Sequence, residues 1–126
     1  DFGIKRGVAL PVSAPFHCPL MQPAADAMAE ALERTPPGPL RVALFANVTA
    51  SVVSDPAEVR RLLVEQVTGR VRWRESAIAM RDAGVERFVE LGGKVLGPMI
   101  TRSAGPDVLV ASVVTMADIE TLAKEL

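Results

Sequence analysis

The apolar positions of this chain fall into short continuous runs and into longer stretches with helical spacing. Continuous apolar runs bounded by turn residues are typical of buried strands. Such runs predict four strands, at residues 5–12, 40–48, 86–91 and 107–114. Pro11 restricts the first strand to a sheet edge or to a strand end, because proline cannot donate a hydrogen bond within a sheet.

In the longer stretches, apolar residues recur every three or four positions, which places them on one face of a helix. These stretches predict helices at residues 20–34, 55–69, 72–83, 95–100 and 116–126. We expect the first helix to bury Leu20, Ala24, Met28, Ala31 and Leu32. We expect the third helix to bury Trp73, Ala77 and Met80.

Local signals mark where two of these helices begin and end. Asp55, Pro56 and Glu58 match an N-cap, the first helical position and the third helical position. Gly84 is placed to end the helix at residues 72–83, because glycine readily adopts the left-handed conformation that follows many helices. Strands that alternate with helices indicate an α/β fold with a largely parallel sheet.

Length, charge and cysteine content narrow the class of protein. The 126 residues allow one ordinary domain, and lysine plus arginine (14) nearly balance aspartate plus glutamate (15). This balance argues against a dedicated nucleic-acid-binding protein. Cys18 is the only cysteine, so an internal disulfide is excluded, and every apolar run is far shorter than a membrane span requires. With no signal peptide recognised in the first residues, we expect a cytoplasmic protein without a membrane partner.

His17 is the strongest candidate for chemistry because it is the only histidine. It follows a predicted strand in a loop flanked by prolines, and open α/β sheets place reactive groups in such loops. Imidazole suits general acid–base work near neutral pH. A hydrogen-bonded loop histidine with no catalytic role is the competing interpretation. Cys18 is interpreted as a small hydrophobe, and one histidine beside one cysteine gives no metal site.

Two further patterns are weak. The stretch Gly92-Gly93-Lys94 resembles a phosphate-binding turn before a helix, but it lacks the full pattern of known phosphate-binding loops, so a structural turn is favoured. No serine of the chain lies in a Gly-x-Ser-x-Gly nucleophile elbow. If His17 is a general base, its nucleophilic partner therefore lies elsewhere.

Four ordered blocks of sequence resemble one family of acyltransferases. They are LPVSAPFHCPLM at residues 10–21, Asn47-Val48-Thr49, the pair LVEQV and VRW at residues 63–67 and 71–73, and FVELGGKVL at residues 88–96. Together they are similar to the malonyl-CoA:acyl carrier protein transacylases of bacterial type II fatty-acid synthesis. The resemblance covers nearly the whole chain, and four blocks in order are far more specific than any one of them.

The resemblance implies roles for three residues. His17 would be the general base that activates a serine, and later the phosphopantetheine thiol of acyl carrier protein. The main-chain carbonyl of Gln66 would orient His17, although an exposed amide at a helix end is the alternative for Gln66. Phe16 would favour malonyl over branched acyl groups in the acyl pocket. The alternative is that Phe16 lines the pocket without selecting the acyl group. The resemblance implies a coenzyme A thioester as substrate, with neither metal nor resident cofactor.

The chain departs from the family pattern in two ways. The serine elbow, the oxyanion glutamine and the carboxylate-binding arginine of the family lie N-terminal to the matching segment and have no counterpart here. Where the family has a Gly-Pro-Gly-Lys block, this chain has Gly92-Gly93-Lys94, which is one residue shorter. Since the chain opens on Asp1, we expect the C-terminal portion of a longer enzyme, with the missing N-terminal portion as its partner.

The resemblance also implies a more detailed fold. Residues 1–12 would end a ferredoxin-like small subdomain, and residues 13–126 would form the C-terminal part of an α/β-hydrolase-like large subdomain. Two alternatives stay open, an acyltransferase domain of a polyketide synthase and a non-catalytic α/β binding module. The missing nucleophile favours the binding module, and the ordered blocks favour the enzyme.

Overall fold

The structure of the chain is a computed structural model that describes residue 7, residue 9 and residues 11–125. Half of the strand expected at residues 5–12, and most of the expected segment 1–12, lie outside these described residues. From residue 13 onward the fold can be compared with the sequence predictions element by element.

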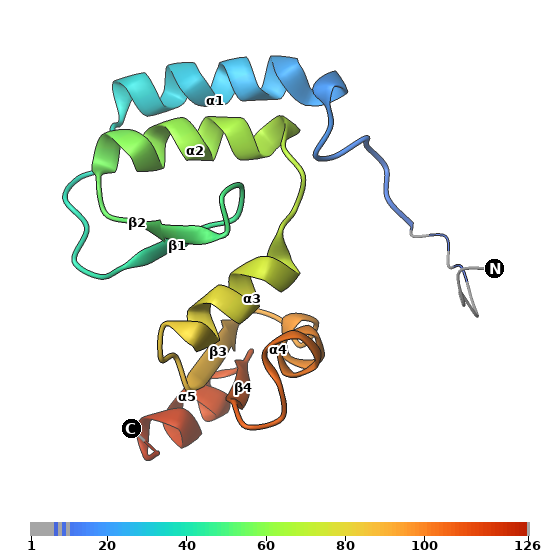
Figure 1. Cartoon of the computed structure of the whole chain (residues 1–126), viewed down its shortest axis with the longest axis vertical. Coiled ribbons are helices and arrows are strands. Elements are labelled where there is room, and N and C mark those ends of the chain that lie inside the picture. Colours follow the sequence, from blue (N-terminus) through green and yellow to red (C-terminus); the bar gives the residue numbers. More distant parts are fainter. Residues whose placement is uncertain (1–6, 8, 10, 126) are drawn as a thin grey trace.

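The described residues form a mixed α/β structure, as the sequence pattern predicts. The elements lie in two groups. Figure 1 shows α1 and α2 side by side over a small β-hairpin, and α3 leading into a second group around β3 and β4. In chain order the elements are a 3-10 turn η1 (Pro19–Met21), α1 (Gln22–Arg34), β1 (Leu44–Ala46), β2 (Ser51–Val53), α2 (Pro56–Thr68), α3 (Trp73–Asp82), β3 (Arg87–Leu91), α4 (Leu96–Ala104), β4 (Leu109–Val113) and α5 (Met116–Ala123). No helix among the described residues is long and apolar enough to cross a bilayer.

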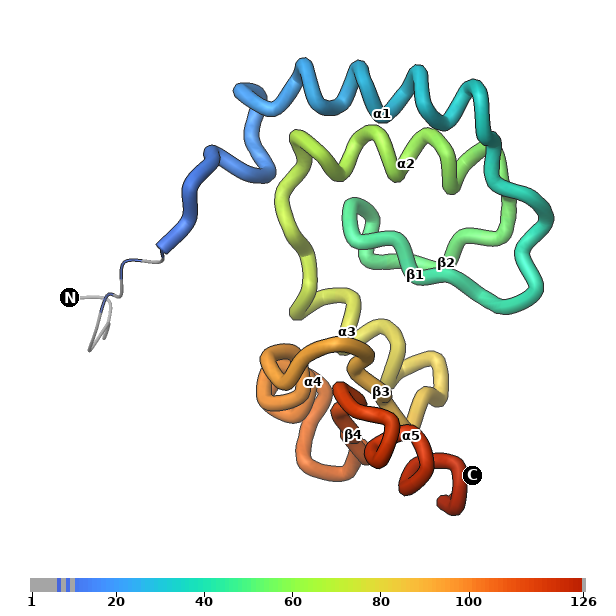
Figure 2. The backbone as a smooth tube through the Cα atoms, turned by 180° about the vertical axis from the view of Figure 1, so that it is seen from behind, coloured from blue at the N-terminus to red at the C-terminus, as the bar shows by residue number. Residues whose placement is uncertain are grey.

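The first hydrophobic core lies between α2 and the hairpin. Val59 and Leu62 of α2 are buried against Ala46 of β1 and Val53 of β2. This apolar contact fixes α2 over the hairpin, with α1 packed on its other side (Figure 2).

The face that α1 turns toward α2 differs from the sequence prediction. Ala25 is the buried residue of α1, whereas the expected core residues Leu20 and Met28 are 75% and 39% exposed. Ala24 and Ala31 of the predicted face are also exposed, and Leu32 is half-buried. The buried side of α1 is therefore narrower than the apolar spacing predicts, and Ala25 lies on it in place of Ala24.

The second hydrophobic core joins the parallel strands β3 and β4 to two helices. Phe88, Ile100, Ala104 and Val108 are buried in it, and the predicted core residues Trp73 and Met80 pack against them. The strands pair in register from Arg87 with Leu109 to Leu91 with Val113. Ala77, also predicted as core, is fully buried in α3.

One predicted strand is shorter than expected, and the described residues do not form the largely parallel sheet that was predicted. Of residues 40–48, only β1 is extended, and it pairs in antiparallel fashion with β2, a strand that the sequence analysis did not predict. The described strands form one antiparallel pair and one parallel pair. The connecting turn needs Ala50 at φ +53°, a left-handed conformation that an alanine does not signal in the sequence.

The helix boundaries agree with most of the predicted signals. The side chain of Asp55 accepts a hydrogen bond from the Ala57 amide at 3.1 Å, as expected of an N-cap. Gly84 follows α3 with φ +90°. Val95, predicted to begin the next helix, instead precedes α4.

A buried carboxylate fixes the start of α4. Glu90 points from β3 to the first turn of α4, where its oxygens accept hydrogen bonds from the amides of Val95, Leu96 and Gly97 at 2.9–3.0 Å. Ser112 donates a longer hydrogen bond of 3.4 Å from β4. These donors favour the ionised form and lower the pKa of Glu90, with the Leu96 amide as the largest cause, while desolvation opposes the shift.

Glu90 therefore predicts acid sensitivity of the fold. Because the folded-state pKa is lowered, its stabilising contribution is complete above the ordinary carboxyl pKa of 4.5 and is lost as the pH falls through the lowered value. We expect Glu90→Gln to reduce the midpoint of urea unfolding at pH 7 and to flatten the loss of stability on acidification. Glu86→Gln, at an exposed carboxylate just before β3, is the control. Equal pH dependence for wild type and Glu90→Gln would contradict this prediction.

Candidate active site

His17 lies in a tight bend immediately before η1. Its side chain is exposed, and its backbone φ is +57°, in the left-handed region that a non-glycine residue seldom adopts. Holding a residue there costs on the order of 1–3 kcal/mol, and such residues concentrate at functional sites. Pro15 and Pro19 flank the bend and restrict its backbone. The bend therefore fixes the direction of the imidazole, and the strained backbone is the energetic cost.

The imidazole contacts the end of α2, which is 49 residues away in sequence. Nδ1 of His17 lies 3.0 Å from the main-chain carbonyl oxygen of Gln66. A carbonyl can only accept, so Nδ1 must carry the proton in this contact. In neutral His17 the lone pair is then on Nε2, which is the atom available to take a proton.

The Gln66 carbonyl is available because α2 ends just after it. The chain becomes extended at Gly69, with φ −81° and ψ +154°, and the Gly69 amide closes the last helical turn on Glu65. A continuing helix would place the Arg70 amide on the Gln66 carbonyl. The last carbonyls of a helix lack such donors and also carry the partial negative charge of the helix dipole. His17 thus meets an acceptor that is oriented by the whole helix.

The neighbours of His17 have separate contacts. Phe16 is 57% exposed, and its amide donates to the Ala14 carbonyl at 2.9 Å. The half-buried Cys18 directs its thiol to the Pro15 carbonyl, with Sγ 3.1 Å from the oxygen. Both contacts stabilise the bend. None of the described serines makes a hydrogen bond to His17.

The turn at Gly92-Gly93-Lys94 has its helix-start amides already occupied. The amides of residues 95–97 donate to Glu90, so the groups that would hold a phosphate are bound to a carboxylate of the same chain. Gly93 lies so close to Glu90 that a Cβ there would come within 2.9 Å of the carboxylate. The structure therefore favours the interpretation of this segment as a structural turn.

A polar link between the two groups of elements was missed by the sequence analysis. The side chain of Asn47, at the end of β1, accepts a hydrogen bond from the Arg72 amide at 2.9 Å. The Arg72 guanidinium donates to the carbonyls of Val48 and Thr49 at 3.4 and 3.2 Å. The blocks at residues 47–49 and 71–73 each matched the family pattern, but neither indicated that the two are in contact.

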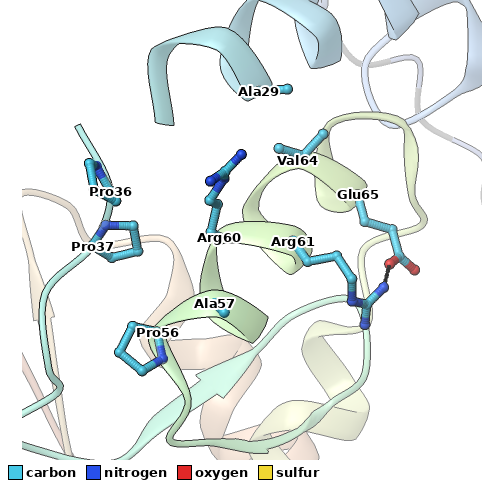
Figure 3. A pocket seen from close by; sticks show the side chains of 9 residues that line it. All are labelled: Ala29, Pro36, Pro37, Pro56, Ala57, Arg60, Arg61, Val64 and Glu65. Carbon is cyan, nitrogen blue, oxygen red and sulfur yellow. Dashed lines mark hydrogen bonds and ion pairs between the residues drawn. The ribbon is translucent and has the colours of Figure 1, made fainter. Parts of the chain in front are cut away.

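A groove of about 630 Å³ lies away from His17, between α1, the prolines after it, and α2 (Figure 3). Two arginines line it, but Arg60 is paired with Glu33, and Arg61 is paired with glutamates of its own helix. Their charge is thus largely neutralised within the chain. Elsewhere, the described part of the chain brings together no three histidine, cysteine or acidic side chains suited to a metal ion.

Comparison with curated proteins supports the resemblance inferred from the four sequence blocks. The chain is 38% identical over 101 residues to the malonyl CoA-acyl carrier protein transacylase of Bacillus subtilis, covering 79% of this chain and 32% of that protein. It is 40% identical over 111 residues to the protein of that name from Salmonella typhimurium, covering 87% of this chain and 35% of that protein. The chain thus spans about a third of the length of these relatives. No protein-family model matches it.

Solved structures of transacylases contain the same arrangement of elements. An acyl-carrier-protein-S-malonyltransferase from Bartonella henselae superposes with a TM-score of 0.85 at 43% identity, covering 98% of this chain and 39% of that one. A malonyl-transacylase in complex with a type II polyketide acyl-carrier protein gives a TM-score of 0.86 at 31% identity, covering 98% and 40% of the two chains.

The contact between His17 and Gln66 predicts one tautomer. At a pH where His17 is neutral, long-range proton–nitrogen NMR should show the proton on Nδ1 and an unprotonated Nε2. As the only histidine, His17 gives an unambiguous pair of ring nitrogens in this chain. The urea-unfolded chain is the control, where both tautomers should be populated. A folded state that carries the proton mainly on Nε2 would refute the assignment.

Proposed function

We infer that this chain belongs to the malonyl-CoA:acyl carrier protein transacylase family and supplies the general base of malonyl transfer. The reaction would move malonyl from coenzyme A to the phosphopantetheine thiol of acyl carrier protein. The observation that carries this proposal is the 3.0 Å contact between His17 Nδ1 and the Gln66 carbonyl, within the segments that resemble the family. Because the chain spans about a third of its relatives, the activity is proposed for the polypeptide that contains it.

In the first half of the proposed reaction, Nε2 of His17 takes the proton of a serine hydroxyl. The serine oxygen attacks the thioester carbonyl of malonyl-CoA, forming a bond to carbon as the carbonyl becomes an oxyanion. When the oxyanion collapses, the carbon–sulfur bond breaks and His17 returns its proton to the coenzyme A thiolate. The products are free coenzyme A and a malonyl-serine ester, with His17 neutral again. We propose that this serine lies outside the 126 residues.

The second half repeats the same proton transfers with a different nucleophile. The phosphopantetheine thiol of the carrier protein gives its proton to Nε2, and its sulfur attacks the malonyl-serine ester. Collapse of the new oxyanion expels the serine oxygen, which recovers the proton from His17. Malonyl is then bound as a thioester to the carrier protein. His17 thus acts as base and then as acid in both halves, and these proton transfers involve no cofactor.

The acceptor at Gln66 supports both halves. A neutral carbonyl fixes the Nδ1–H tautomer without itself gaining a proton, and so it serves where many hydrolases use a carboxylate. The backbone alone therefore orients the base.

We further propose that residues 13–126 form part of an α/β-hydrolase-like large subdomain. The likeness to longer solved malonyltransferases supports this proposal. An N-terminal portion would supply the serine elbow, the oxyanion-hole glutamine and an arginine for the malonyl carboxylate. We place the reaction in the cytoplasm on the family resemblance alone.

A polyketide carrier protein is the alternative acceptor, because one matched structure joins a malonyl-transacylase to such a carrier. The chemistry at His17 would be the same, since both kinds of carrier present a phosphopantetheine thiol. A non-catalytic binding module, the other alternative, is disfavoured by the contact between Nδ1 of His17 and the Gln66 carbonyl, because this contact leaves Nε2 able to take a proton.

Removal of the imidazole tests the proposed base. In the native polypeptide that contains this chain, His17→Ala should lower the rate of malonyl transfer by about 10²–10⁴-fold, the usual contribution of a positioned acid–base group. Thermal unfolding should stay close to that of wild type, because the side chain is exposed. Leu20→Ala, at an exposed residue of the same segment, is the matched control and should retain transfer. Wild-type transfer by His17→Ala would exclude the assignment.

Phe16 is proposed to restrict the acyl group. If its ring limits the pocket beside His17, Phe16→Ala should raise the kcat/KM ratio of methylmalonyl-CoA to malonyl-CoA by about tenfold, the lower range for a contact of methyl size. Leu20→Ala removes another exposed apolar side chain from the same segment and should leave the ratio unchanged. An unchanged ratio in Phe16→Ala would reject this role.

A further inference from the structure

The break between α2 and α3 is not explained by local sequence alone. Residues 66–76, QVTGRVRWRES, contain no proline. Gly69 is the only residue there with a strong preference against helix, and a glycine costs only about 1 kcal/mol relative to alanine in a helix interior. A contact from outside the segment must therefore help to end α2 at Thr68 and restart the helix at Trp73.

That contact comes from the turn between β1 and β2, through Asn47 and Arg72. The side-chain oxygen of Asn47 accepts a hydrogen bond from the Arg72 amide at 2.9 Å. The Arg72 guanidinium donates to the carbonyls of Val48 and Thr49. In return, the Arg72 carbonyl accepts hydrogen bonds from the amide and the hydroxyl of Ser76, both at 2.9 Å. Arg72 is thus tied to the hairpin on one side and to the first turn of α3 on the other.

We propose that Asn47 is a positioning residue for His17, an inference that rests on the proposed function. By holding the Arg72 amide, Asn47 keeps residues 69–72 off the helical path of α2. The Gln66 carbonyl then has no helical donor and stays open to Nδ1 of His17. Asn47 thus acts on His17 indirectly, through residues 69–72 and the C-terminal end of α2.

The alternative conformation shows why the Arg72 amide matters. If the helix continued through residues 69–72, the Arg72 amide would bind the Thr68 carbonyl and the Arg70 amide would bind the Gln66 carbonyl. The second of these bonds would compete directly with His17. Asn47 offers the Arg72 amide another acceptor and so opposes that rearrangement.

The position of Asn47 relative to α2 fits this role. Asn47 and Gln66 both line a small cavity of about 200 Å³ between the hairpin and the last turns of α2. The hairpin is itself anchored to α2 through the buried residues Ala46 and Leu62. Asn47 therefore extends from a fixed support, and the Arg72 amide is held at a defined place relative to the helix end.

The experiment compares three variants in the native polypeptide that contains this chain. Asn47→Ala removes the acceptor, and Asn47→Asp keeps an oxygen that can accept from the Arg72 amide. Ser51→Ala is the matched control, because it removes a hydrogen bond to Thr49 within the same turn without touching Arg72. The readouts are the His17 tautomer by proton–nitrogen NMR, assigned against His17→Ala, and kcat and KM for malonyl transfer.

We expect Asn47→Ala to lose the Nδ1–H preference of neutral His17 and to lower kcat by about 10–100-fold, by analogy with groups that orient metal-ligating histidines. KM for malonyl-CoA should change little, and Asn47→Asp and Ser51→Ala should match wild type. A wild-type tautomer and kcat in Asn47→Ala would overturn the proposal. Equal losses in Asn47→Ala and Asn47→Asp would also overturn it, since a general loss of packing would then suffice.

The tautomer readout separates this proposal from the proposed function. If the polypeptide transfers no malonyl but Asn47→Ala still shifts the His17 proton, the positioning role stands and the reaction is misassigned. If malonyl is transferred but the tautomer and kcat are insensitive to Asn47, the reaction stands and the positioning role is wrong.

Discussion

The hydrogen bond from His17 Nδ1 to the Gln66 carbonyl is the constraint on which the proposed chemistry depends. It joins a strained bend near the start of the described chain to the end of a helix 49 residues later. The acceptor belongs to the main chain, so no single side-chain substitution at residue 66 removes it. What can remove it is a change in the path of the backbone after Thr68, where α2 ends. The base is therefore specified by the boundary of a helix more than by the identity of a neighbouring side chain.

The same physical rule recurs at other helix ends in this chain. A helix leaves its first amides and last carbonyls without partners, and these groups need acceptors and donors from elsewhere. Asp55 supplies an acceptor for α2, and Glu90 supplies acceptors for three amides of α4. At the C-terminal end of α2 the partner is the imidazole of His17. The arrangement that stabilises the other helix ends is thus used here to orient a reactive group.

The sequence predicted most helices and the two parallel strands well, because their periodicity and end signals are local. Asp55 and Gly84 acted as expected, and His17 was singled out by its position and by the family resemblance. The hairpin was missed because its turn uses Ala50 in a left-handed conformation, where no glycine or asparagine signals the turn. The prediction of the buried face of α1 was wrong, because the spacing of one helix does not show which neighbour it packs against. The link from Asn47 to Arg72 spans 25 residues and depends on two elements being placed together, which no local pattern encodes.

The two hydrophobic cores have a mechanical consequence for the imidazole. One core holds α2 and the hairpin, the other holds α3, α4 and the parallel strands, and the covalent connection between them is the short segment from Gly69 to Arg72. That segment begins three residues after the carbonyl that accepts from Nδ1 of His17, and Arg72 at its end is bonded to the hairpin. The direction of a single ring is therefore linked to how the second core is placed against the first.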